Sequence, residues 1–94
     1  MRLTNLVSIV TGGASGFGES ICRAFTTEGA RVVIADINSE LGEHGASNLR
    51  AAGHDAIFCR TDVTKSADMA ALVQTTVDRH GRLDIMVNNA GISH

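Results

Sequence analysis

The sequence predicts an α/β fold of three layers, in which a parallel sheet lies between two layers of helices. Short apolar runs rich in β-branched residues alternate along the chain with longer segments of helical periodicity. Four of the ten glycines fall in TGGASGFG, from Thr11 to Gly18, where the first apolar run meets the first helical segment. Strand–helix units at this spacing imply right-handed βαβ crossovers and therefore parallel strands.

The first strand is expected from Leu6 to Val10, a short apolar run with β-branched members. The first helix follows the glycine-rich turn and continues to about Thr27, and Gly29 is a suitable cap for its C-terminus. The run from Ala30 to Asp36 predicts a second strand, apolar enough to be covered on both faces. Large apolar residues recur every four positions and predict one face of the first helix: Phe17, Ile21 and Phe25.

The second helix, from Ser39 to Gly53, is expected to be weaker than the first. Gly42 and Gly45 each cost it roughly 1 kcal/mol relative to alanine, so packing must hold it in place. The third strand is expected from Ala56 to about Arg60. The apolar residues of this second helix are Leu41 and Leu49.

The third helix has a clearer pattern. Ser66 is expected to cap its N-terminus, Asp68 in the first turn suits the helix dipole, and Gly81 lies just beyond its end. A fourth strand, from Leu83 to Val87, runs into the segment NNAG. The apolar side of the third helix carries Met69, Leu72, Val73 and Val77.

Composition excludes several classes of protein. A net charge of −2 gives no reason to expect nucleic acid or an anionic membrane as a partner. No apolar run suits a signal peptide or a membrane span, so a cytoplasmic protein is expected. Cys22 and Cys59 have no metal-type spacing with the four histidines, so we expect two buried, reduced thiols and no metal site.

The glycine-rich turn predicts a site for an anion. Glycine permits backbone angles that other residues resist, and it lets a ligand approach the main chain closely. The unpaired N–H groups and the positive dipole end of the following helix would attract a phosphate. The alternative is a strained turn that needs glycine for its geometry alone.

Polar and acidic residues follow the other predicted strands. The second strand ends in Asp36, eighteen residues after Gly18, close to the spacing at which an acidic residue meets a nucleotide ribose. Any one polar or acidic residue after a strand could belong to an ordinary turn. Because ligands bind beyond the carboxyl ends of strands in such sheets, together they predict a nucleotide site. The residues after the third and fourth strands are Asp62, Val63, Asn88, Asn89, Ala90 and Gly91.

Asp36 also bears on which nucleotide binds. Its carboxylate can accept hydrogen bonds from both ribose hydroxyls of NAD, whereas the 2′-phosphate of NADP would place two negative groups about 4 Å apart. That repulsion is on the order of 4 kcal/mol at an effective dielectric constant near 20, before salt screening. Neither Arg nor Lys stands at Ala14, Ser15 or Ile37 to offset it. NAD is therefore the expected cofactor.

Together these motifs resemble the cofactor half of a short-chain dehydrogenase/reductase. The glycine spacing, TGxxxGxG, is that family's own and differs from the G-x-G-x-x-G of other dinucleotide folds. The resemblance covers residues 1–94 and implies a partial Rossmann-type NAD-binding domain, truncated after the fourth strand. The residues that carry it are Thr11, Gly12, Gly16, Gly18, Asp36, Asp62, Val63, Asn88, Asn89, Ala90 and Gly91.

The resemblance implies a pyrophosphate site at the glycine-rich turn. Gly12 and Gly18 belong to the TGxxxGxG motif of this turn. Phe17 stands where the family usually has a smaller aliphatic residue, so its ring must find room, although its N–H can still serve. The pyrophosphate would be lined by the main chain of three consecutive residues, Ser15, Gly16 and Phe17.

The resemblance also assigns the residues at the later strand ends. Asp36 would hold the adenosine ribose, and Asp62 with the backbone of Val63 would meet the edge of the adenine. Asn88 would brace the sheet. The residues that would border the adenosine and the nicotinamide side are Asn89, Ala90 and Gly91.

The family's catalytic residues have no counterpart in this sequence. They are a Ser, a Tyr-x-x-x-Lys pair and often an Asn, all located after the fourth strand. The sequence has no tyrosine, and its single lysine, Lys65, is expected to be a solvated surface charge. No catalytic residue is therefore predicted. The chain is expected to be an inactive N-terminal fragment of an enzyme that transfers hydride between a secondary alcohol or ketone and NAD. The resemblance implies a homo-oligomeric parent enzyme.

Two other functions compete with this interpretation. A stand-alone nucleotide-binding module would bind the cofactor without turnover. A methyltransferase that uses S-adenosylmethionine would also place glycines after the first strand and an acid after the second. The TGxxxGxG spacing and the NNAG segment argue against the methyltransferase.

Overall fold

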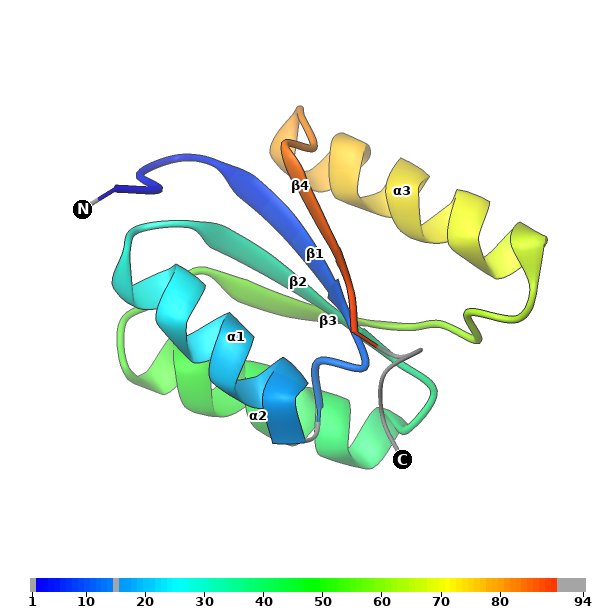
Figure 1. The fold of residues 1–94 in the computed structure, drawn as a ribbon, viewed down its shortest axis with the longest axis horizontal. Coiled ribbons are helices and arrows are strands. Elements are labelled where there is room, and N and C mark those ends of the chain that lie inside the picture. The colour runs from blue at the N-terminus through cyan, green and yellow to red at the C-terminus, as the bar shows by residue number, and fades with distance from the viewer. Residues whose placement is uncertain (1, 15, 90–94) are drawn as a thin grey trace.

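Four parallel strands form one sheet in the order β3-β2-β1-β4, and three helices connect them in the computed structural model (Figure 1). The structure describes residues 2–14 and 16–89. The predicted α/β class, the parallel sheet and the order of elements are confirmed. Along the chain the elements are β1 (Val7–Thr11), α1 (Gly16–Thr27), β2 (Arg31–Asp36), α2 (Ser39–Ala51), β3 (Ala56–Arg60), α3 (Ser66–His80) and β4 (Ile85–Asn88).

Each face of the sheet has its own apolar cluster, because successive residues of a strand point to opposite faces. One cluster joins Val10 of β1 to Cys22 of α1 and Leu49 of α2. The other joins Ile9 of β1 to Leu72 of α3. The sheet is therefore covered on both sides, as the apolar character of its central strands predicted.

The ends of three strands differ by one or two residues from the sequence prediction, and β2 begins one residue late, at Arg31. β1 continues to Thr11, which pairs in register with Ala35 of β2 and with Asn88 of β4. β4 begins at Ile85, two residues later than expected, and Asp84 just before it makes two hydrogen bonds to Val7 at the start of β1. The Asp84 N–H donates to the Val7 carbonyl oxygen at 2.8 Å, and its Oδ2 accepts from the Val7 N–H at 2.9 Å.

The start of α3 corrects one sequence prediction. Lys65 occupies the N-cap position, and Ser66 is the first helical residue. The Lys65 carbonyl oxygen accepts from the Met69 N–H at 3.1 Å, while the Lys65 side chain makes no capping hydrogen bond. The prediction of Ser66 as the N-cap was therefore wrong by one residue, because a hydroxyl residue lies beside the helix boundary.

The predicted apolar face of α1 is only partly buried. Ile21 and Phe25 are half-buried, whereas Phe17 is 75% exposed. Leu41 in α2 and Val77 in α3 are also exposed, although the sequence assigned them to apolar sides. Small side chains instead bring α1 close to the sheet and the turn before it. The buried residues of α1 are Gly18, Cys22 and Thr26.

The two glycines of α2 have opposite surroundings. A Cβ on Gly42 would overlap the ring of Phe58 on β3, so the missing side chain lets the ring pack against the helix. A Cβ on Gly45 would meet only the Cδ1 atom of Ile34, at 3.7 Å, which is an ordinary contact. Gly42 is therefore needed for packing, while Gly45 is not.

Alanine at these two positions is expected to change stability in opposite directions. Gly45→Ala should raise the free energy of unfolding by about 0.5–1 kcal/mol, because alanine is the better helix former. Gly42→Ala should lower it by about 1–2 kcal/mol, because the ring of Phe58 must move from its site. Urea denaturation of the two variants, followed by circular dichroism, measures both effects. A gain of stability in both variants would show that Gly42 has no packing role.

Candidate functional site

The carboxyl ends of β1, β2 and β4 meet at one edge of the sheet, where the turn after β1 is held from both sides. The Gly12 N–H donates to the Ala35 carbonyl oxygen at 2.7 Å. From the β4 side, Asn89 Nδ2 donates to the Gly12 carbonyl oxygen at 3.2 Å. The Ala14 N–H donates to Asp36 Oδ2, also at 3.2 Å. These hydrogen bonds bring residues from three predicted strand ends into one network.

The glycine-rich turn has a backbone that glycine adopts most easily. Gly12 and Gly16 lie in the left-handed region, with φ angles of 64° and 49°. Gly18 has a different role, in close packing. It is buried in the first turn of α1, where a Cβ would overlap the Gly12 carbonyl oxygen and lie 2.7 Å from the Gly13 Cα. Close packing therefore sets the unpaired N–H groups at the start of α1 directly beside the turn.

Asp36 is half-buried at the end of β2, and the backbone fixes both of its carboxylate oxygens. Oδ2 accepts from the Ala14 N–H at 3.2 Å, and Oδ1 accepts from the Asn38 N–H at 3.0 Å. Each carboxylate oxygen has a second lone pair, so both can still accept a hydrogen bond from a ligand hydroxyl. The carboxylate is thus oriented before any ligand arrives.

A groove of about 120 Å³ extends from Asp36 toward the end of β3. Its walls include Asp62 and Val63, which the sequence analysis assigned to the site, and among the described residues no lysine or arginine lines it. Three further lining residues, Ala35, Ile37 and Thr61, were not predicted as site residues. Their only signal was position, since each stands next to a predicted site residue. The groove is lined by Gly12, Ala35, Asp36, Ile37, Thr61, Asp62 and Val63.

Asp62 shapes the loop between β3 and α3. Its Oδ1 accepts from the Thr64 hydroxyl at 2.6 Å and from the Thr64 N–H at 3.0 Å. These hydrogen bonds lower the pKa of the Asp62 carboxyl, so it is ionised at neutral pH. The Asp62 N–H donates to Asp68 Oδ2 at 2.9 Å, which ties the loop to the first turn of α3. Asp62 therefore has a local structural role as well as a position in the groove.

The two asparagines after β4 differ in their surroundings. Asn88 Oδ1 accepts from the Thr11 hydroxyl at 3.1 Å, which links β4 to β1 as the sequence analysis expected. Asn89 is 5% exposed, and its Oδ1 has no hydrogen-bond partner within residues 2–14 and 16–89. A buried acceptor without a donor is costly. Three predicted site residues lie outside the described residues: Ser15, Ala90 and Gly91.

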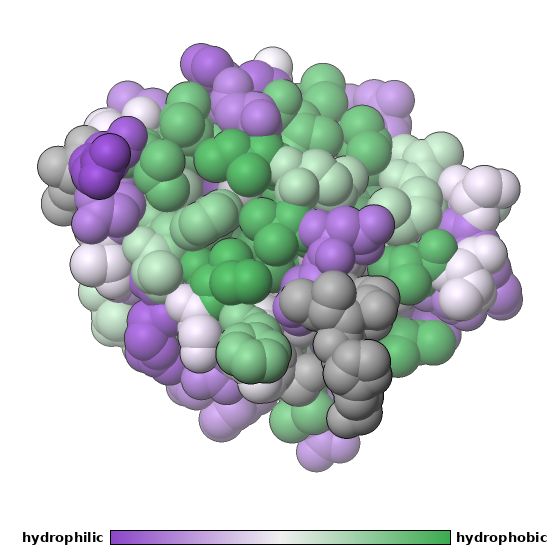
Figure 2. All heavy atoms as spheres, viewed as in Figure 1, coloured by the Kyte–Doolittle hydropathy of each residue, from purple (hydrophilic) through white to green (hydrophobic). Residues whose placement is uncertain are grey.

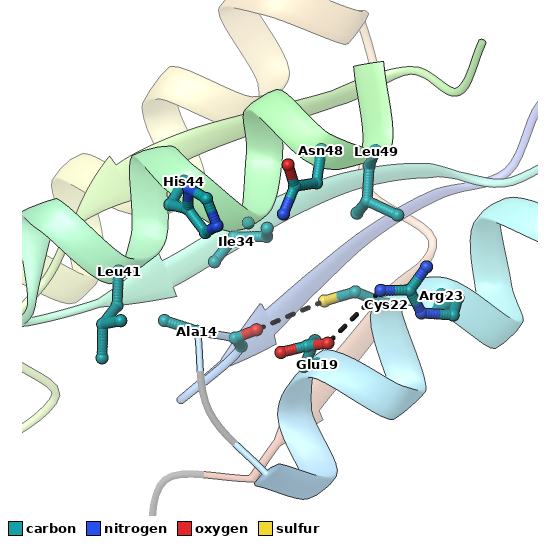
Figure 3. A pocket seen from close by; sticks show the side chains of 11 residues that line it. Ala14, Glu19, Cys22, Arg23, Ile34, Leu41, His44, Asn48 and Leu49 are labelled. Atoms are coloured by element: carbon teal, nitrogen blue, oxygen red, sulfur yellow. Dashed lines mark hydrogen bonds and ion pairs between the residues drawn. The ribbon is translucent and has the colours of Figure 1, made fainter. Parts of the chain in front are cut away.

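A second cavity, of about 70 Å³, lies between α1 and α2 (Figure 3). Glu19 and Arg23 of α1 face His44 and Asn48 of α2 across it, and the Cys22 thiol points toward the Gly13 carbonyl oxygen. Burial, with a smaller contribution from the Glu19 charge, raises the pKa of Cys22 to about 12. The thiol is therefore protonated at neutral pH and is a poor nucleophile.

The described residues contain neither a membrane-spanning helix nor a group of potential metal ligands. In residues 2–14 and 16–89, no helix combines the length and the apolar character needed to cross a membrane. Within the same ranges, no three His, Cys, Asp or Glu side chains are grouped so that they could hold a metal ion.

The fold and this edge of the sheet define an α/β protein with a glycine-rich turn beside an oriented carboxylate. The family model described as short chain dehydrogenase matches residues 6–94. The chain therefore belongs to the short-chain dehydrogenase family, whose members are oxidoreductases that use nicotinamide cofactors. The resemblance stated from the sequence is confirmed.

Known relatives match almost all of this chain. Tropinone reductase-like 1 of Erythroxylum coca is 50% identical over 91 residues, which cover 97% of this chain and 32% of that protein. Zerumbone synthase of Zingiber zerumbet is 46% identical over 93 residues, which cover 99% and 34%. A crystal structure of hydroxysteroid dehydrogenase from Escherichia coli superposes with a TM-score of 0.90 at 36% identity, covering 93% and 36%. The chain spans about a third of the length of the curated relatives it matches.

Proposed function

We propose that this chain is the cofactor-binding part of an NAD-dependent oxidoreductase that acts on a secondary alcohol or ketone. The observation that carries the proposal is the carboxylate of Asp36, which lies at the head of the groove with both oxygens oriented by backbone N–H groups. A carboxylate in that position favours a ribose with free hydroxyls over one with a 2′-phosphate.

The residues present fit a dinucleotide. The packing of Gly18 against Gly12 gives the bare backbone that a pyrophosphate needs, and the start of α1 supplies N–H donors. Asp36 is an acceptor for ribose hydroxyls, and Asn89 would border the adenosine. Asp62 and Val63 would border the adenine in the groove. The nicotinamide, when bound, supplies the hydride chemistry.

The chain itself is proposed to bind the cofactor without turnover. The family's Tyr-x-x-x-Lys pair has no counterpart here, because the sequence contains no tyrosine. This supports the second candidate function, a nucleotide-binding module, for the 94 residues taken alone. The substrate, and a homo-oligomeric assembly, belong to the proposal for a longer enzyme. The free cysteines Cys22 and Cys59 suit a reducing compartment such as the cytoplasm.

Calorimetric titration of the 94-residue chain with NAD and with NADP tests the proposal. We expect NAD to bind at least about tenfold more tightly, because the 2′-phosphate would face the Asp36 carboxylate. Far-UV circular dichroism of the same sample establishes that the chain is folded. If the folded chain binds neither nucleotide, or binds NADP more tightly, the proposal is wrong.

A further inference from the structure

His80 is the last residue of α3, and one of its ring nitrogens is buried without a partner. The Nε2 atom has no hydrogen-bond partner within residues 2–14 and 16–89. A neutral imidazole can present a bare lone pair at one nitrogen, whereas an imidazolium carries an N–H at both. A buried N–H without an acceptor is costly, so this position suits the neutral ring.

Charged groups from three parts of the chain act on His80. Asp55, which lies just before β3, favours the protonated ring, whereas Arg31 of β2 and Arg79 of α3 oppose it. Asp55 is also shared with another cation, because the Arg31 Nε atom lies 3.6 Å from its Oδ2 atom. Two guanidinium groups therefore act against the single carboxylate that could stabilise a charged ring.

Burial has the largest effect on this ring and lowers the pKa of His80 below its ordinary value of 6.5. The loop after α3 supplies no further carboxylate to oppose this effect, since Asp84 Oδ1 already pairs with Arg82 Nη2 at 2.7 Å. His80 is therefore neutral at neutral pH, and a mildly acidic solution would force a proton onto a ring whose surroundings disfavour it.

His80 is the residue through which the last turn of α3 packs. The three residues before it, Val77, Asp78 and Arg79, are all exposed, whereas His80 is half-buried. The middle of the helix is better fixed, because Leu72 is fully buried in the cluster that contains Ile9.

The last turn matters because of how little else covers this face of the sheet. Among the described residues, α3 alone lies on it, while α1 and α2 lie on the other face (Figure 1). In Figure 2, apolar side chains gather in the middle of the view, over the region where β4 and α1 lie in Figure 1. Part of the apolar surface is thus uncovered even with α3 in place, and loosening of α3 would uncover more.

We propose that His80 is a pH-sensitive contact: the neutral ring keeps the last turn of α3 against the sheet, and the protonated ring releases it. The contact lies near the amino ends of β2 and β3, at the edge opposite the candidate nucleotide site, and does not depend on the proposed function. Because the unfolded chain binds the proton more readily, the stability that this contact confers is complete above pH 6.5 and is lost as the pH falls below it.

Urea denaturation of the 94-residue chain at about pH 7.5 and about pH 5.5 tests the contact. On acidification, we expect the equilibrium constant for folding to fall about four- to tenfold more in the parent chain than in His80→Phe, which keeps a ring but cannot be protonated. The carboxyl groups of Asp62 and Asp84, whose pKa values are lowered, titrate below this range. The matched control is His44→Phe on the exposed surface of α2, which should keep the pH dependence of the parent chain.

Nuclear magnetic resonance of the parent chain provides a test that needs no variant. The ring protons of His80 should titrate with a midpoint below pH 6.5. A midpoint at or above that value would mean that Asp55 or the helix dipole stabilises the charged ring, and the proposal would be wrong.

Amide hydrogen exchange locates the effect in the chain. At about pH 5.5, amides in the last turn of α3 should exchange at least about threefold faster in the parent chain than in His80→Phe, and at about pH 7.5 the two should agree. Equal exchange in the two proteins at both pH values, or an equal pH dependence of their stability, would overturn the proposal. If His80→Phe does not fold, the titration midpoint of the parent chain decides alone.

Discussion

Replacement of Gly18 by alanine is expected to lower the free energy of unfolding by about 3–4 kcal/mol and to abolish NAD binding. The added Cβ would overlap the Gly12 carbonyl oxygen and crowd the Gly13 Cα. These are backbone atoms, so no side-chain rotation can relieve the overlap. The turn cannot retreat either, since hydrogen bonds to Ala35 and Asn89 hold Gly12 from both sides. Urea denaturation and NAD titration of the variant measure the two effects.

Gly16→Ala is the matched control for this substitution. Gly16 also lies in the turn motif, but a Cβ there would meet no atom of the described residues within 4 Å, and the cost comes only from its φ angle of 49°. That strain is worth about 1–2 kcal/mol. Overlap at Gly18 should therefore cost clearly more than strain at Gly16. Equal losses of stability in the two variants would contradict the packing argument.

The sequence predicted the fold well because the fold depends on local patterns. β-Branched apolar runs and glycine boundaries located all four strands to within two residues, and the crossover rule then determined that they are parallel. The rule that ligands bind beyond the carboxyl ends of strands likewise predicted that Gly12, Asp36 and Asn89 meet at one edge. In the structure Asn89 donates to the Gly12 carbonyl oxygen, and Asp36 accepts from the Ala14 N–H in the same turn. Sequence position alone was sufficient for these relations.

The sequence could not predict features that depend on contacts across elements. The helical periodicity predicted that Phe17 and Ile21 lie on the same face of α1. Whether each of these side chains is buried depends on how far the sheet extends beneath α1. Helix propensity predicted only that Gly42 destabilises α2. Its stabilising effect comes from the ring of Phe58 on β3, which packs where a side chain would be. The role of Asp84 was missed for the same reason, since its partner Val7 is 77 residues away.

Replacement of Asp36 by asparagine is expected to shift the preference between NAD and NADP by about 30- to 100-fold toward NADP. The substitution removes the negative charge that would face a 2′-phosphate, and salt screening reduces the unscreened repulsion of about 4 kcal/mol to this range. Asparagine has nearly the shape of aspartate and keeps one oxygen that can accept from the Ala14 or Asn38 N–H. Parallel calorimetric titrations of parent and variant measure the ratio of the two affinities.

The matched control for Asp36→Asn is Asp62→Asn, at the far end of the same groove. Hydrogen bonds from Thr64 lower the pKa of the Asp62 carboxyl, so Asp62 is ionised at neutral pH. Its loss removes the same charge from the groove, but from the adenine side rather than the ribose side. The ratio of NAD to NADP affinity should therefore stay within about threefold of the parent value. An equal shift in both variants would mean that the net charge of the groove, and not the carboxylate at the ribose, selects the cofactor.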